Sequence, residues 1–156
     1  MRVKLQASRI ALYALLAVWL LSACATRSDE PQPPEIIYSQ DVCDGCDMII
    51  SDPKYAAATI LINGETRKFD DIGEMLAYHM DHPEAQVKVW FVHDHDSEKW
   101  VRGETAFFVR GDLTTSMGDS IAAFTDRAAA EAFAAEVNGK VYSLDELRVE
   151  VHLTMH

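Results

Sequence analysis

The stretch YAAATILINGETRKFDDIGEMLAYHM, residues 55–80, decides the fold. Small and β-branched residues run up to Asn63-Gly64, and a second strand-like run follows this pair. An Asn-Gly pair between two such runs is typical of a β-hairpin. Asp71 then stands three residues before Glu74, and apolar residues recur at helical spacing after it. The stretch therefore predicts two antiparallel strands followed by a capped helix.

A similar order of elements recurs further along the chain. An apolar strand is predicted at residues 87–92, and the second half then offers two strands, a helix, a strand and a short helix. These lie at residues 105–109, 120–124, 127–137, 141–142 and 143–147, with Thr125 or Asp126 as the cap of the alanine-rich helix. We therefore expect an α+β fold in which two similar small ββαβ-type units, residues 38–95 and 96–156, pack as one compact domain.

The N-terminal residues indicate export and lipid attachment. Three basic residues fall within residues 1–9, and residues 10–21 carry no charge. This run is too short to span a bilayer and is typical of a secretory signal peptide, residues 1–23. Leu21-Ser22-Ala23-Cys24 resembles the lipobox of bacterial lipoproteins, so we expect an acyl chain such as palmitate on Cys24. Residues 24–37 contain three prolines and are typical of a tether. We expect this tether to hold the domain at the outer membrane, on the side that faces the periplasm.

The charge of the chain excludes some partners. The sequence has 14 Lys and Arg and 25 Asp and Glu, a formal net charge of −11, and removal of residues 1–23 lowers it to −14. Nucleic acid and anionic lipid repel such a chain, so we expect no nucleic-acid binding. The sequence also has no Ser-His-Asp order and no glycine-rich phosphate loop. A binding or carrier role is therefore favoured over an enzyme.

The hexapeptide CDGCDM, residues 43–48, carries the most specific chemistry. Cys43, Cys46 and Met48 offer two thiols and a thioether within six residues, and Gly45 permits a tight turn between the cysteines. Soft sulfur donors select soft metals, and a thioether beside thiolates favours Cu(I) over Zn(II). Cu(I) is therefore the expected ligand of this segment.

Two other uses of the cysteine pair stay open. Cys43 and Cys46 could form a plain disulfide in an oxidising compartment. The protein would then be a structural lipoprotein whose cysteines only cross-link a loop. They could also serve a thiol-disulfide oxidoreductase of the cell envelope. Such a catalyst needs a lowered thiol pKa, whereas Asp41, Asp44 and Asp47 around the thiols should raise it.

Further metal donors are scattered along the chain. Met117 stands in the polar loop TTSMG and is a candidate ligand. His79 and His82 lie three residues apart on the predicted helix, and His93 and His95 stand among acidic residues that favour a solvated turn. The terminal Met155-His156 could be a metal-binding tail or a frayed end.

Several motifs together resemble the NosL family. They are Cys-x-x-Cys-x-Met at residues 43–48, FDDI at 69–72, WVRGETAFFV at 100–109, SMG at 116–118 and NGKVYSLDEL at 138–147. The resemblance spans residues 42–147. It implies a copper-binding accessory lipoprotein of denitrification that binds Cu(I) and delivers it to nitrous oxide reductase, whose membrane transporter complex is a further expected partner. It also implies a fold of two ββαβ-type units related to a domain of organomercurial lyase.

The resemblance carries ligand positions onto this chain. The copper ligands of the family correspond to Cys46, Met48 and Met117. Asp47 and Ser116 stand where many members have glycine and proline, and these departures leave the donors themselves intact. Cys43 is either a further ligand or the disulfide partner of Cys46.

Overall fold

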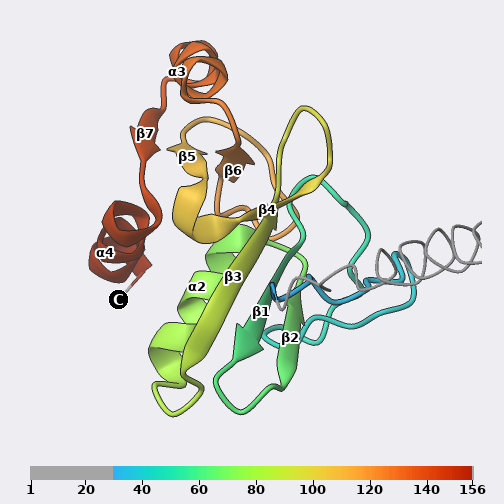
Figure 1. Ribbon diagram of the computed structural model, residues 1–156. Helices are drawn as coiled ribbons and strands as arrows, with labels where there is room; N and C mark the ends of the chain where they lie inside the picture. Colours follow the sequence, from blue (N-terminus) through green and yellow to red (C-terminus); the bar gives the residue numbers. More distant parts are fainter. Residues whose placement is uncertain (1–29, 156) are drawn as a thin grey trace, which may run out of the picture. The chain divides into compact units, whose positions relative to one another are not determined.

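The computed structural model describes residues 30–155, which form two antiparallel sheets with helices packed on them (Figure 1). The predicted signal peptide, Cys24, the first part of the tether and His156 lie outside the described residues. Within residues 30–155, none of the helices has the length and apolar character needed to cross a bilayer.

The first sheet contains the predicted hairpin. Strands β1 (Ala57–Leu61) and β2 (Thr66–Phe69) pair antiparallel with Ala57 opposite Phe69, and Gly64 adopts a φ of +89° in the turn. Strands β3 (Val87–His93) and β4 (Trp100–Arg102) complete the order β2-β1-β3-β4. The hairpin prediction is therefore confirmed.

Helix α2 (Ile72–Asp81) begins directly after β2. Its N-cap is Asp71, whose side chain accepts a hydrogen bond of 2.9 Å from the backbone N–H of Gly73. Ile72, Met75 and Leu76 of this helix are buried against the first sheet in the main core. The cap predicted from the sequence thus fixes where the helix begins, immediately beside the last residues of β2.

The second sheet has the order β6-β5-β7, formed by β5 (Phe107–Arg110), β6 (Ile121–Phe124) and β7 (Lys140–Tyr142). The first predicted strand of this half starts two residues late because residues Gly103–Thr105 form a 3-10 turn, η1. Helix α3 (Arg127–Glu136) begins at the N-cap Asp126, which accepts from the N–H of Ala129 at 2.9 Å. The cap is therefore Asp126 and not Thr125.

Helix α4 (Leu144–Met155) is longer than predicted. Ser143 and Glu146 form the expected capping box, with Ser143 N–H donating to Glu146 Oε2 at 2.8 Å. The helix continues past Leu147 because Val151, four residues on, is also fully buried in the main core. The polar cap pattern marked the start of this helix but gave no information about its end.

The main core lies between the two sheets and is shared by them. It contains one face of each sheet together with α2 and α4, and it includes Phe69, Val92, Phe108, Ile121 and Leu147. The opposite face of the second sheet packs on α3 through Val109, Ala122 and Phe124. Alternate residues of β6 therefore point into different cores.

The α+β class is confirmed. Strand pairing is alike in the two sheets, since β1 lies between β2 and β3, and β5 between β6 and β7. Strand β4 joins the first sheet although it lies beyond residue 95, the predicted end of the first unit. The division of the fold into two similar ββαβ-type units stays a prediction. Its relation to a domain of organomercurial lyase also stays a prediction.

Candidate metal centre

The cysteine segment is a closed loop held by its own backbone. Ser39 N–H donates to Ile50 O and Cys43 N–H to Met48 O, both at 2.8 Å. Asp47 N–H donates to Cys43 O at 3.1 Å, and the φ of +61° at Asp47 then turns the following residues back toward Cys43. The loop thus brings Cys43, Cys46 and Met48 round a tight turn, as the spacing of the motif requires.

Strand β2 anchors this loop to the first sheet. Asp44 N–H donates to Lys68 O at 2.8 Å, and Lys68 N–H returns a hydrogen bond of 2.7 Å to Asp44 Oδ2. The ammonium group of Lys68 also contacts Asp41 at 2.7 Å. These bonds cover the outer edge of β2 and hold the cysteine loop beside the end of that strand.

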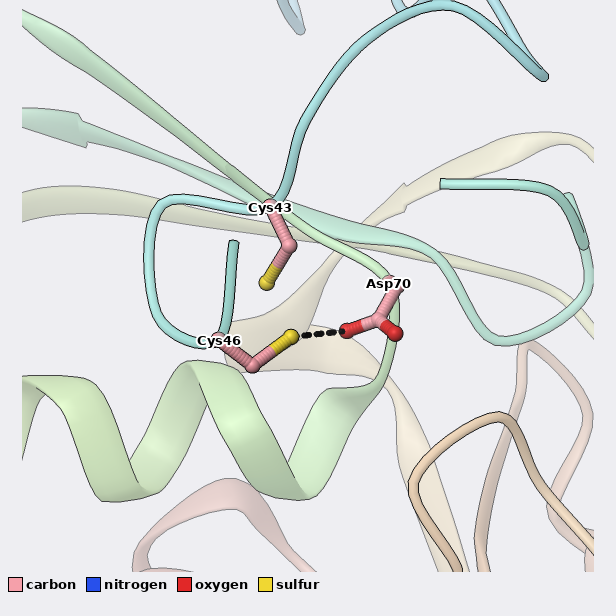
Figure 2. A group of neighbouring side chains, drawn as sticks. All are labelled: Cys43, Cys46 and Asp70. Atoms are coloured by element: carbon pink, nitrogen blue, oxygen red, sulfur yellow. Dashed lines mark hydrogen bonds between the residues drawn. The ribbon is translucent and has the colours of Figure 1, made fainter. Parts of the chain in front are cut away.

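Two thiols and one carboxylate converge where the loop meets the end of β2 (Figure 2). One donor atom each from Cys43, Cys46 and Asp70 lies within 4.8 Å of the others. Cys46 Sγ donates a hydrogen bond to Asp70 Oδ1 at 3.6 Å. Cys43 and Asp70 are only 1% and 2% exposed, while Cys46 is half-buried, so a metal ion would enter past Cys46.

Asp70 was not among the residues predicted from the sequence. It stands in the FDDI motif, directly before the helix cap Asp71, and a second acid at a helix start is ordinarily a favourable charge near the helix dipole. The sequence carried no signal for its contact with Cys46, because Asp70 lies 24 residues further on and reaches the thiol only in the folded chain.

The surroundings of the thiols disfavour the thiolate form. Burial raises the pKa of the Cys43 thiol to about 12. Burial also raises the pKa of Cys46, and the Asp70 carboxylate adds to that rise. The direction expected from the sequence is thus correct, but burial and Asp70 cause the rise, whereas Asp41, Asp44 and Asp47 had been expected to cause it.

More carboxylates gather at the start of α2. Burial raises the pKa values of Asp71 and Glu74, and burial together with Asp71 raises the pKa of Asp119 to about 6. A side chain placed on Gly45 would collide with the Glu74 carboxylate, so the cysteine loop and the helix are in close approach. Carboxyl groups therefore surround the candidate site.

The two methionines approach the same region through their backbones. Met117 N–H donates to Asp71 Oδ2 at 3.2 Å, which ties the SMG loop to the residue after Asp70. Met48 O accepts from Cys43 N–H, as described above. The side chains of Met48 and Met117 are 52% and 37% exposed, unusual for methionines that only fill a core. Their role as ligands stays a prediction.

The histidines have structural partners. His93 is buried, with its Nδ1 3.0 Å from Ala56 O and its ring centroid 3.7 Å from that of Trp100, so the prediction of a solvated turn was wrong for it. His93 is the last residue of β3, and packing around this strand buries it although acidic residues follow it in the sequence. His79 Nε2 lies 3.0 Å from Thr59 Oγ1, and the ring of His82 stacks on Tyr78.

The arrangement suits a soft cation held by sulfur. Cys43 and Cys46 are both free thiols, and the loop places them close enough to bind one ion together. Thiolates and thioethers favour soft metals, whereas the oxygen of Asp70 is a hard donor. The thiols could therefore hold the ion, with Asp70 as a negative charge beside it.

Comparisons with known proteins agree with this chemistry. The family model described as NosL matches residues 34–152. Among solved structures, the chain is similar to the crystal structure of the copper chaperone NosL from Shewanella denitrificans, with 27% sequence identity and a TM-score of 0.65. That match covers 74% of this chain and 96% of the other. A search of curated proteins found no match.

Proposed function

The chain belongs to the NosL family, and we propose that it is a copper chaperone that carries Cu(I) for assembly of the copper centre of nitrous oxide reductase. Membership of this family also means that the chain is a carrier and not an enzyme. Support for copper comes from the solved relative, which is named a copper chaperone.

One observation carries the proposal: the convergence of Cys43, Cys46 and Asp70 within 4.8 Å. Two thiols at this spacing supply the soft donors that Cu(I) prefers. Met48 and Met117 would complete the ligand set. Met48 O accepts from Cys43 N–H, Met117 N–H donates to Asp71, the residue next to Asp70, and both methionines are exposed.

Release follows from the same geometry. Cys43 is buried while Cys46 is half-buried and Met48 and Met117 are exposed, so a partner can replace the outer sulfur ligands first. Cu(I) would then pass from ligand to ligand without entering water as a free ion. The raised thiol pKa values assist release, because a thiol that loses copper readily takes up a proton.

The place of delivery is part of the proposal. A lipid on Cys24 and the tether after it would keep the domain at the periplasmic face of a membrane, here the outer membrane. Tethering raises the effective concentration of a carrier at a membrane-bound partner such as a transporter complex for nitrous oxide reductase maturation.

Cu(I) titration of the reduced chain against a competing chelator tests the proposal. We expect one ion per chain, with tight binding lost in Cys46→Ser and weakened in Met48→Ala and Met117→Ala. Cys43→Ser decides whether Cys43 is a ligand. Met80→Ala is the matched control, because Met80 stands in the last turn of α2, away from the cysteine loop, and is only partly buried. Unchanged binding in the Cys46 and Met48 variants would reject the ligand assignment.

The alternative, a thiol-disulfide oxidoreductase that uses Cys43 and Cys46, finds less support. Catalytic thiols of that class have lowered pKa values, whereas burial raises both here. A measured thiol pKa well below 8, together with disulfide-exchange turnover, would reverse this preference.

A further inference from the structure

The cysteine loop carries exposed apolar side chains on its outer face. Val42 and Ile49 are antiparallel bridge partners, so their side chains lie side by side on one face of the loop. They are 50% and 56% exposed, whereas Cys43 and Ile50, the residues that follow them, are buried in the main core. Met48, which precedes Ile49, is exposed as well. We call the side chains of Val42, Met48 and Ile49 the loop patch.

The loop patch concentrates apolar surface in one short segment. Among residues 30–155, four of the eight large apolar side chains that are exposed belong to residues 37–49, namely Ile37 and the three of the loop patch. Exposed apolar side chains scattered singly are ordinary on a folded protein, whereas contiguous ones mark interaction sites. The same loop carries Cys43 and Cys46, so a partner on the loop patch stands beside the candidate metal centre.

The charge around the loop patch has a single sign. Residues 30–53 contain six Asp and Glu and no Lys, Arg or His. Asp44 and Asp47, within the loop, are exposed. Lys68 reaches the loop from β2, but its ammonium group is paired with Asp41 at 2.7 Å. A partner therefore meets apolar side chains that are bordered by negative charge.

We propose that the loop patch docks a partner protein whose contact surface has aliphatic side chains at its centre and Lys or Arg at its rim. Such a surface matches the loop patch in apolar character and in charge, and the attraction between opposite charges speeds the encounter. The inference rests on the proposed function, because a partner that docks beside the metal centre is then the one that exchanges Cu(I) with it.

Two other occupants fit the charge of the loop less well. A second copy of the chain would bring two acidic loops together, and like charges repel. A lipid bilayer that took up the patch would also strip water from Asp44 and Asp47, which is costly for a carboxylate. A basic protein surface carries neither penalty, since it supplies ion partners for both carboxylates.

Two synthetic peptides test the proposal on the copper-free chain. One fluorescein-labelled peptide alternates Leu with Lys, and its twin alternates Leu with Glu. Fluorescence anisotropy with the full-length chain in phosphatidylcholine nanodiscs, corrected with empty nanodiscs, should show the Lys peptide binding at least ~tenfold tighter than the Glu peptide. The double variant Val42→Ser, Ile49→Ser should weaken binding of the Lys peptide at least ~tenfold, and Asp47→Asn should weaken it severalfold.

Matched controls separate the loop patch from general charge and stickiness. Ile62→Ser changes an aliphatic side chain that is 65% exposed at the hairpin, and Glu136→Gln removes one exposed carboxylate on α3. Both should leave the affinity for the Lys peptide unchanged. Equal binding of the two peptides, or binding insensitive to the Val42 and Ile49 substitutions, overturns the proposal.

Two further measurements detect the other occupants. Quenching of Ile49→Trp fluorescence by brominated phosphatidylcholine in the nanodiscs would place the loop patch in the bilayer. Concentration-dependent dimers in detergent that Ile49→Ser abolishes would place a second copy on it. Either result overturns the proposal.

The Cu(I) titration described above judges the proposed function separately. Val42→Ser and Ile49→Ser leave every sulfur donor in place, so both variants should keep the copper affinity of the parent chain. A parent chain that bound no copper but kept the peptide preferences would reject the copper function alone. A chain that bound copper but showed no peptide preference would reject the docking surface alone.

Discussion

The Cys46 thiol donates its hydrogen bond to the Asp70 carboxylate, with Sγ and Oδ1 3.6 Å apart. The more accessible thiol of the candidate metal centre thus stands beside a buried carboxylate. Once the thiol proton has left, thiolate and carboxylate repel each other. A Cu(I) ion held by two thiolates also leaves the site with net negative charge, so Asp70 opposes retention of the ion.

Asp70→Asn should therefore bind copper more tightly. Removal of one negative charge beside the thiolate lowers the pKa of Cys46 and stabilises the copper-bound form, by about tenfold in affinity for one pKa unit. Chelator competition and titration of the thiolate absorbance measure the two effects. Asp96→Asn, at an exposed carboxylate, is the control. Weaker binding in Asp70→Asn would mean that the carboxylate is itself a ligand.

Copper binding should release protons. Burial raises the pKa of Cys43 to about 12 and also raises that of Cys46, so both thiols are protonated at neutral pH. Each thiol that becomes a ligand loses its proton, and the apparent affinity should rise about tenfold per pH unit for each. Calorimetry in buffers of different ionisation enthalpy counts these protons. A pH-independent affinity would contradict ligation by the cysteine thiolates.

Gly45→Ala should disturb the metal centre through Glu74. The added Cβ would collide with the Glu74 side chain, which must move aside from its place between the cysteine loop and α2. We expect a loss of about 1 kcal/mol in unfolding free energy, as for other overpacked positions. The double variant Gly45→Ala, Glu74→Ala should recover most of that loss. Chemical denaturation compares the two, and failure of the rescue would point to backbone strain at residue 45 instead.

Stability should fall between pH 6.5 and pH 4 because of His79. Burial lowers the pKa of His79 to about 4, while its ring bonds Thr59 and Ala85 in the neutral form. Above pH 6.5 the ring is neutral in both states and its stabilisation is complete. As the pH falls, the unfolded chain takes up the proton first, which costs about 1–2 kcal/mol after allowance for partial exposure.

Denaturation midpoints across this pH range measure the effect. His79→Gln should flatten the pH dependence, and His152→Gln, at an exposed position of α4, should leave it as in the parent chain. Identical pH profiles for His79→Gln and the parent would show that another group causes the loss.

Local signals in the sequence were sufficient for most of the fold. Asp71, Asp126 and Ser143 were predicted as helix caps or the start of a capping box, and each makes the expected hydrogen bond, because capping depends on residues within one turn. The pairing of β4 with β3, and the length of α4, depend on contacts with distant strands and on burial of Val151. Local patterns carry no information about such contacts.

Only the local part of the candidate site could be predicted, because the rest depends on contacts between residues distant in sequence. Cys43 and Cys46 share a motif whose spacing is itself the chemical signal. Asp70 joins them from 24 residues further on, through the antiparallel return of β2, so only the folded chain brings it to Cys46. His93 was misassigned because it is the last residue of β3 and packs against Ala56 and Trp100, whereas the polar turn begins only after it.

Helix α2 and the SMG loop meet at a single carboxylate. Asp71 accepts from Gly73 N–H in the first turn of the helix and from Met117 N–H of the loop. Because one side chain closes both the helix start and the loop, the two segments should open together as one cooperative unit. Amide hydrogen exchange should then report a single opening free energy for the first turn of α2 and for residues 116–118.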